Sequence, residues 1–154
     1  MSTSDFSDVT LNFDAVLFDA GDTLIRLTDG ETLLRRAAAE LGVTALNPAE
    51  VARVWRRVLE RASTAEELAK GRDLSPERHR EVWIELYETA GCAALARGLS
   101  ERLYELTLRA DSWEAFPDSV ATLRALRARG VRLGLVSDTG FDLRPALDRL
   151  GLAA

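Results

Sequence analysis

A carboxylate at the end of a short apolar run near the start of the sequence is placed to act as a nucleophile. Asp19 follows the apolar residues 15–18 directly, and Gly21, Asp22 and Thr23 come after it. A carboxylate is ionised at neutral pH, so it can attack an electrophilic centre without a separate base. The pattern favours covalent catalysis by Asp19 over a helix cap or a solvated turn acid.

A hydroxyl group ends a second apolar run much later in the chain. Residues 131–136 are largely apolar, Ser137 and Asp138 follow them, and a helical segment over 118–129 comes before. A strand, a helix and a second strand form the right-handed crossover unit, whose strands lie side by side. We therefore expect Ser137 to lie beside Asp19. The main-chain N–H of Asp138 would stand near a helix start, which favours an anionic phosphoryl group.

These two runs indicate the fold class. A short apolar run bounded by polar residues suits a strand buried on both faces of a parallel sheet, and residues 15–18 fit this description. Open α/β sheets bind ligands at the carboxyl ends of their strands, where Asp19 and Ser137 stand. The sequence predicts an α/β fold with a parallel, Rossmann-like core.

The long segment between the two runs has helical periodicity. Residues 24–27 and a turn at Asp29 and Gly30 lead into it. Apolar residues then recur at intervals of three and four, with helix start signals at Asn47 and Ser75. The helices predicted are 31–41, 48–62, 76–90 and 100–110. Such a small bundle would close over the site, exclude water and select the substrate.

Several side chains of this segment fit structural roles better than catalytic ones. Trp55 and Trp83 lie on apolar stripes and are expected to pack in the core. His79, the only histidine, is expected to be solvated or to cap a helix, and Cys92, the only cysteine, to be buried. The arginines of the second predicted helix are typical of a solvated face: Arg53, Arg56 and Arg57.

The apolar strand, Asp19, the Gly-Asp-Thr-Leu that follows it and the later strand ending in Ser137 resemble the haloacid dehalogenase-like hydrolase superfamily, in the branch with a helical cap. The resemblance spans essentially the whole chain. It implies that Asp19 forms a covalent intermediate with a phosphoryl group or a carbon centre, and that Ser137 and Asp138 hold the substrate. Phosphatase members bind Mg²⁺, which implies Asp19 and the main-chain carbonyl of Gly21 as metal ligands.

The resemblance also implies a domain organisation and a reaction. Residues 12–28 and 115–154 would form the Rossmann-like core, and residues 29–114 the inserted helical cap. The implied function is Mg²⁺-dependent hydrolysis of a phosphoester through an aspartyl-phosphate on Asp19, with a small phosphorylated metabolite as the substrate. Dehalogenation is a variant of the same chemistry.

The sequence departs from the phosphatase pattern at two places. The second Asp, which protonates the leaving group, would stand at Gly21, whereas the acid here is Asp22, one position later. The later lysine and acidic pair are not found, since Lys70 is the only lysine and no acid follows Asp148. The alternative is therefore a truncated or degenerate, non-catalytic module. Its incomplete core would leave strand 15–18 as an exposed edge that pairs with a second copy or a partner chain.

Composition argues against other classes of function. The 154 residues are 47% hydrophobic, which suffices for a core. A net charge of -5, with acidic and basic residues interspersed, argues against nucleic-acid binding. No stretch approaches the roughly 18 consecutive apolar residues of a membrane span, and the polar start of the chain does not resemble a signal peptide. We expect a cytoplasmic protein that does not bind membranes.

Overall fold

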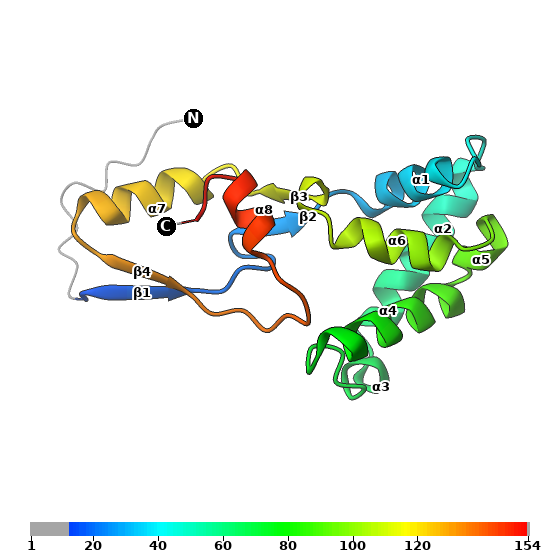
Figure 1. Cartoon of the computed structure of the whole chain (residues 1–154), viewed down its shortest axis with the longest axis horizontal. Helices are drawn as coiled ribbons and strands as arrows, with labels where there is room; N and C mark the ends of the chain where they lie inside the picture. Colours follow the sequence, from blue (N-terminus) through cyan, green and yellow to red (C-terminus); the bar gives the residue numbers. More distant parts are fainter. Residues whose placement is uncertain (1–12, 154) are drawn as a thin grey trace.

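The structure is a computed structural model that describes residues 13–153. It is elongated, with a parallel pair of strands at one end, a cluster of helices at the other and a short two-stranded ribbon between them (Figure 1). Positions 12 and 154, the outer bounds of the predicted core, lie outside the described residues.

The two predicted core strands lie side by side. β1 (Ala15–Phe18) and β4 (Arg132–Leu135) form a parallel pair. The helix before β4, α7 (Ser119–Ala128), packs against that strand, as a crossover connection requires. The N–H of Val136 donates to the Phe18 carbonyl over 2.9 Å, so the pairing extends to the carboxyl ends of both strands. The predicted α/β fold is confirmed.

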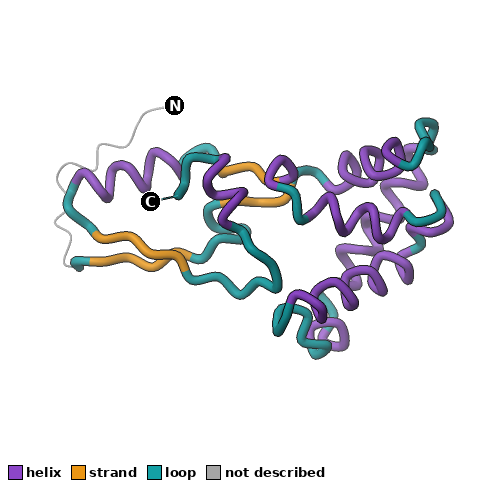
Figure 2. The backbone as a smooth tube through the Cα atoms, in the orientation of Figure 1, coloured by secondary structure: helices purple, strands orange, loops and turns teal. Residues whose placement is uncertain are grey.

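The apolar sequence of β1 predicted a strand buried on both faces, and this prediction is wrong. Leu17 is 70% exposed, and Val136, just beyond β4, is 63% exposed. Within the described residues the sheet has β1 and β4 as its two strands, and α7 lies along one side of the pair (Figure 2). A strand is buried on both faces only where neighbouring elements cover both. Among residues 13–153, β4 is the strand that pairs with β1, and no strand lies at the other edge of β1.

A short antiparallel ribbon joins the two ends of the molecule. β2 (Ile25–Leu27) pairs with β3 (Trp113–Ala115), and Leu27 stands opposite Trp113. The chain leaves for the helices along β2 and returns along β3 (Figure 1). The apolar residues of β2 were recognised in the sequence, but β3 was missed, because a strand of three residues shows no periodic pattern.

The helical insertion consists of α1 to α6. Its helices are α1 (Gly30–Glu40), α2 (Pro48–Ala62), α3 (Ala65–Leu68), α4 (Pro76–Ala90), α5 (Cys92–Leu95) and α6 (Leu99–Thr107). The side chains of Asn47 and Ser75 cap α2 and α4, as their sequence signals predicted. The one-turn helices α3 and α5 were not predicted. No helix in the described part of the chain is long and apolar enough to cross a membrane.

Both junctions between the ribbon and the helices differ from the prediction. The turn expected at Asp29 and Gly30 is a helix start, since Asp29 Oδ2 accepts a hydrogen bond from the Thr32 N–H over 2.9 Å and α1 begins at Gly30. The helix predicted to reach residue 110 ends at Thr107, and a short 3-10 turn, η1 (Ala110–Ser112), leads into β3.

Apolar side chains form two separate clusters. The larger fills the helical insertion and includes Leu33, Leu34, Val51, Val58, Leu86 and Leu103. Cys92 lies in this cluster, and Trp55 and Trp83 pack against it, as predicted. The expected solvated face of α2 is also confirmed by the exposed side chains of Arg53, Arg56 and Arg57. The smaller cluster lies behind the end of β1 and consists of Ala20, Leu24, Ile25, Leu143 and Leu147.

Candidate functional site

Asp19 lies at the carboxyl end of β1, beside Ser137 at the end of β4. The Ser137 hydroxyl donates a hydrogen bond to Asp19 Oδ1 over 3.2 Å. The Thr23 hydroxyl donates to Asp19 Oδ2 over 3.4 Å. The predicted meeting of Asp19 and Ser137 is confirmed, and each carboxylate oxygen faces a different hydroxyl. Because a carboxylate offers about four acceptor sites, both oxygens keep a lone pair for a substrate or an ion.

A tight turn after Asp19 brings Thr23 back to the carboxylate. The Ala20 carbonyl accepts a hydrogen bond from the Leu24 N–H over 2.9 Å, and the Leu24 side chain is buried in the smaller apolar cluster. Asp22 has a φ of 56°, in the left-handed region that Asp adopts more readily than most residues. Leu24 thus anchors the turn in the apolar cluster, while Asp22 and Thr23 are exposed to solvent.

The orienting role of Thr23 was missed in the sequence, where this residue served only as part of a motif. Its spacing of four positions from Asp19 carried no periodic signal, because the contact depends on the left-handed conformation at Asp22. A Thr that follows a nucleophile candidate across such a turn is the pattern that indicates this contact.

Gly21, Asp22 and Asp138 are exposed, as is Asp19 itself. A Cβ placed on Gly21 would meet no heavy atom within 4 Å. No donor among the described residues bonds to the Gly21 carbonyl oxygen, so that oxygen is available to a ligand. In the same part of the chain, the hydrogen bonds to the Asp19 carboxylate come from Thr23 and Ser137 and not from Asp22.

A loop separates Ser137 from the last helix of the chain. The last helix, α8 (Arg144–Arg149), starts only after residues 138–143. Asp142 Oδ1 accepts a hydrogen bond from the first N–H of α8 over 3.0 Å, so this side chain satisfies one of the free donors at the helix start. That Ser137 and the Asp138 N–H face the start of this helix stays a prediction.

His79 is buried and neither solvated nor a helix cap, so that prediction is wrong. The residue is 6% exposed, and its Nδ1 lies 3.0 Å from the Tyr104 hydroxyl. Its ring packs against that of Phe141, in the loop after Ser137. Burial lowers the pKa of the imidazole, although the charge of Asp73 opposes the shift, so His79 is neutral near pH 7.

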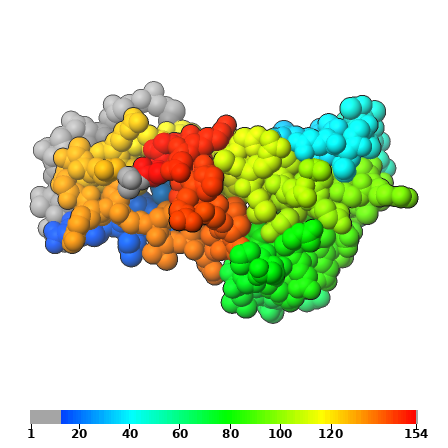
Figure 3. Space-filling view, in the orientation of Figure 1, coloured from blue at the N-terminus to red at the C-terminus, as the bar shows by residue number. Residues whose placement is uncertain are grey.

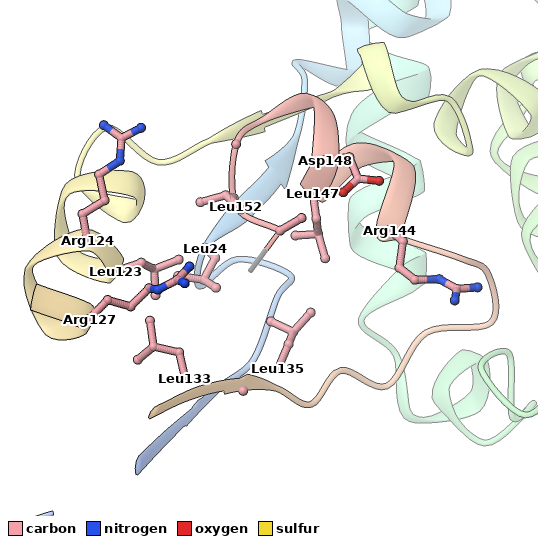
Figure 4. A pocket seen from close by; sticks show the side chains of 13 residues that line it. Leu24, Leu123, Arg124, Arg127, Leu133, Leu135, Arg144, Leu147, Asp148 and Leu152 are labelled. Atoms are coloured by element: carbon pink, nitrogen blue, oxygen red, sulfur yellow. The ribbon is translucent and has the colours of Figure 1, made fainter. Parts of the chain in front are cut away.

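A separate groove of about 460 Å³ opens between β4, α7 and α8 (Figure 4). Leucines from several elements point into it, among them Leu123, Leu133, Leu135 and Leu147. None of the predicted site residues lines this groove. This groove is therefore distinct from the carboxylate site at the strand ends.

The described residues offer a small set of oxygen ligands for a metal. Residues 13–153 contain no group of three or more His, Cys, Asp or Glu side chains that could hold a metal ion. Mg²⁺ in phosphate-binding sites usually keeps several waters and takes one or two carboxylates together with substrate phosphate oxygens. The Asp19 carboxylate and the Gly21 carbonyl fit that smaller donor set, since both residues are exposed at one turn.

A family model for haloacid dehalogenase-like hydrolases matches residues 13–153. The chain therefore belongs to the haloacid dehalogenase-like hydrolases, as its motifs predicted. Its fold is similar to the crystal structure of a dehalogenase, with a TM-score of 0.54 and 23% sequence identity over 94% of this chain and 60% of that one. The likeness shows the fold, and this chain spans about 60% of the length of that dehalogenase. Among curated proteins, no sequence matches this chain.

Proposed function

We propose that this protein hydrolyses phosphoesters of small metabolites through an aspartyl-phosphate on Asp19, with Mg²⁺ as the cofactor. The observation that carries the proposal is an exposed carboxylate held by two hydroxyls, Ser137 at 3.2 Å and Thr23 at 3.4 Å. A carboxylate oriented in this way presents a lone pair toward solvent in a fixed direction, which favours attack on a bound electrophile. Family membership supports hydrolysis, and the sequence motif supports the phosphoester.

The reaction takes two displacement steps. Asp19 attacks phosphorus, the bond between phosphorus and the ester oxygen breaks, and the leaving oxygen takes up a proton. A water oxygen then attacks the phosphorus of the aspartyl-phosphate, inorganic phosphate leaves, and the Asp19 carboxylate is restored. One water is consumed for each alcohol and phosphate formed.

Ser137 has a second task in this scheme. Its hydroxyl has one proton to donate, and in the structure that proton faces Asp19 Oδ1. When a phosphoryl group binds, the hydroxyl rotates to donate to a phosphoryl oxygen, and the main-chain N–H of Asp138 provides a further donor. Asp19 Oδ1 then loses a hydrogen bond, which makes the carboxylate a better nucleophile at the moment the substrate arrives.

Asp19 and Gly21 are the residues that would hold Mg²⁺, through a carboxylate oxygen and the main-chain carbonyl. When bound, the ion screens the repulsion between the carboxylate and the anionic substrate. Gly21 suits this position because no side chain crowds the carbonyl, and no heavy atom lies within 4 Å of the place a Cβ would take.

Asp22 is the proposed acid and base of the reaction, because Gly21 has no side chain that could protonate the leaving group. Asp22 is exposed and follows Gly21 in the turn. Its left-handed φ of 56° turns the chain at this point. The Asp22 carboxylate therefore leaves the backbone in a different direction from a side chain at position 21. A contribution from Asp22 is therefore largest for leaving groups that need a proton.

We further propose residues 29–114 as a cap domain over a core formed by residues 12–28 and 115–154. The pairing of β2 with β3 supports this division, because it brings the two ends of the insertion together on the core side (Figure 1). Closure of the helices over Asp19 would exclude water and select the metabolite.

A second candidate, association with another copy of this chain without catalysis, is favoured by the open edge of β1. Leu17 is 70% exposed, and in the described residues β1 pairs with β4 alone. A strand edge with unpaired N–H and C=O groups is a template for pairing with another chain. Pairing of two β1 strands would extend the sheet and satisfy the backbone N–H and C=O groups at that edge.

The deciding experiment measures release of inorganic phosphate from a panel of small phosphoesters, and release of halide from haloacids, by the full chain with Mg²⁺. We expect phosphate release, and a loss of at least about 10³-fold for Asp19→Asn, since the nucleophile is removed. Asp118→Asn, which alters an exposed acid before α7, is the matched control and should keep the wild-type rate. Halide release without phosphate release would overturn the phosphoester proposal, and neither release would favour the second candidate.

A further inference from the structure

Gly140, in the loop that follows Ser137, lies directly against His79 of the helical insertion. A Cβ on Gly140 would stand 2.4 Å from His79 Cβ and 2.7 Å from its Cγ, so a larger residue would push the two apart. Gly140 is buried at this contact. In Figure 3 the surface of the segment before α8 adjoins that of α4, the helix that carries His79.

Phe141 extends this contact into an aromatic cluster. Its ring centroid lies 5.2 Å from that of His79 and 5.9 Å from that of Trp113 in β3. Both ring pairs are tilted and fall within the distance range of favourable aromatic contacts. The loop is therefore held from two directions, by the insertion and by the ribbon.

His79 is itself fixed by its neighbours. Its Nδ1 lies 3.0 Å from the Tyr104 hydroxyl of α6, and its ring centroid is 6.1 Å from that of Trp83, one turn along α4. The other ring nitrogen of His79, Nε2, lies 3.9 Å from Asp73 Oδ1. A ring in contact on so many sides has one orientation, and it can transmit that orientation to the loop it touches.

We propose that His79 is a positioning residue of the candidate site, which holds Gly140 and Phe141 and thereby fixes Ser137 beside Asp19. The hydrogen bond from Ser137 to Asp19, at 3.2 Å, is long for an O–H donor, so a loop shift of about 0.5 Å decides whether it forms. This inference rests on the proposed function, because the position of Ser137 affects turnover only if Asp19 is the nucleophile.

Hydrogen exchange of residues 137–143 in the full chain tests the loop contact without reference to catalysis. His79→Ala removes the ring, and Leu86→Ala is the control, since Leu86 is a fully buried residue of the same helix in the larger cluster. We expect exchange in the loop to become faster in His79→Ala and to stay near the wild-type rate in Leu86→Ala. Equal loop exchange in wild type and His79→Ala overturns the proposal.

A double-mutant cycle tests the positioning role. If His79 acts through Ser137, His79→Ala lowers kcat by no more than Ser137→Ala does, about 10²-fold, and the double variant is no slower than Ser137→Ala alone. Losses that multiply in the double variant overturn the role. If the wild type hydrolyses no phosphoester, the proposed function fails, and the exchange rates alone decide whether His79 holds the loop.

Discussion

Ser137 Oγ lies 3.2 Å from Asp19 Oδ1, although 118 positions separate the two residues in the sequence. The parallel pairing of β1 with β4 produces this contact, because the Val136 N–H carries the ladder to the Phe18 carbonyl, one residue before each functional side chain. Backbone hydrogen bonds thus bring the two strand ends together, and in the proposal above the contact of His79 with the following loop sets the final distance between hydroxyl and carboxylate. Substitution of either side chain should change the chemistry more than the fold.

We expect Ser137→Ala to lower kcat/KM for phosphoester hydrolysis by about 10²-fold, because it removes a donor to the phosphoryl group. The free energy of unfolding should change by less than about 1 kcal/mol, since Ser137 is half-buried and its partner Asp19 stays hydrated. Phosphate release and urea unfolding measure the two effects. Thr122→Ala, an exposed hydroxyl on α7, is the control, and a Ser137→Ala protein of wild-type activity would contradict the assigned role.

The contribution of Asp22 should depend on the leaving group. We expect Asp22→Asn to slow hydrolysis of an alkyl phosphate by about 10²-fold or more, because an alkoxide leaves poorly without a proton. Hydrolysis of a nitrophenyl phosphate, whose leaving group is stable as an anion, should change little. The ratio of the two rates is the measurement, and an equal loss on both substrates would show that Asp22 is not the acid.

Removal of divalent cations should abolish turnover, and added Mg²⁺ should restore it. The reason is that Asp19 and the substrate are both anionic, and the described residues provide no Lys or Arg hydrogen bond to the Asp19 carboxylate. Phosphate release before and after chelation measures the effect. Isothermal titration of Mg²⁺ into wild type and Asp19→Asn identifies the ligand, and unchanged binding in the variant would exclude Asp19.

Acidification should destabilise the protein through His79. Burial lowers the pKa of the imidazole from its usual 6.5, with Asp73 opposing the shift and Arg72 adding to it. The unfolded state therefore binds a proton that the folded state does not, and stability falls as the pH drops from 6.5 toward the lowered folded value.

Urea unfolding between about pH 7.5 and about pH 5.5 measures this loss, in the range where histidine rather than carboxylates titrates. His79→Phe keeps an aromatic ring that does not titrate, so its stability should fall less over the same range. An equal fall in both proteins would mean that the pKa of His79 is not shifted by folding.

Self-association through β1, if it occurs, should be sensitive to charge at Leu17. We expect Leu17→Arg to shift the chain toward monomer, because a charge on an exposed apolar strand face opposes pairing. Leu74→Arg is the matched control, since Leu74 is 85% exposed in the insertion. Light scattering gives the mass of each protein, and a monomeric wild type would remove the association proposal.

The strand ends could be predicted from the sequence, and the burial of the strands could not. An apolar run that stops at Asp19 or Ser137 has the composition of a parallel strand and its ligand end. Whether Leu17 is covered depends on which elements lie on either side of β1, and the run itself carries no such information. The same limit applies to β3, whose three residues are a strand only because β2 lies beside them.

The environment of His79 could not be predicted either. Its neighbours Tyr104 and Phe141 come from α6 and from the loop after β4, so the contact exists only once the insertion has folded against the core. A lone histidine in a polar stretch favours a solvated position on composition alone.

The pairing of Leu27 with Trp113 in the ribbon sets the two ends of the insertion next to each other. The Thr28 N–H adds a hydrogen bond to the Ser112 carbonyl over 2.8 Å, so the two chain segments are joined just before they separate. A segment whose ends meet in this way can be exchanged for a different one, or for a short turn, without moving the flanking strands. Evolution can therefore alter the inserted helices while β1 and β4 stay paired, and in the proposal above Ser137 keeps its place only where the new module retains a group against Gly140, as His79 does here.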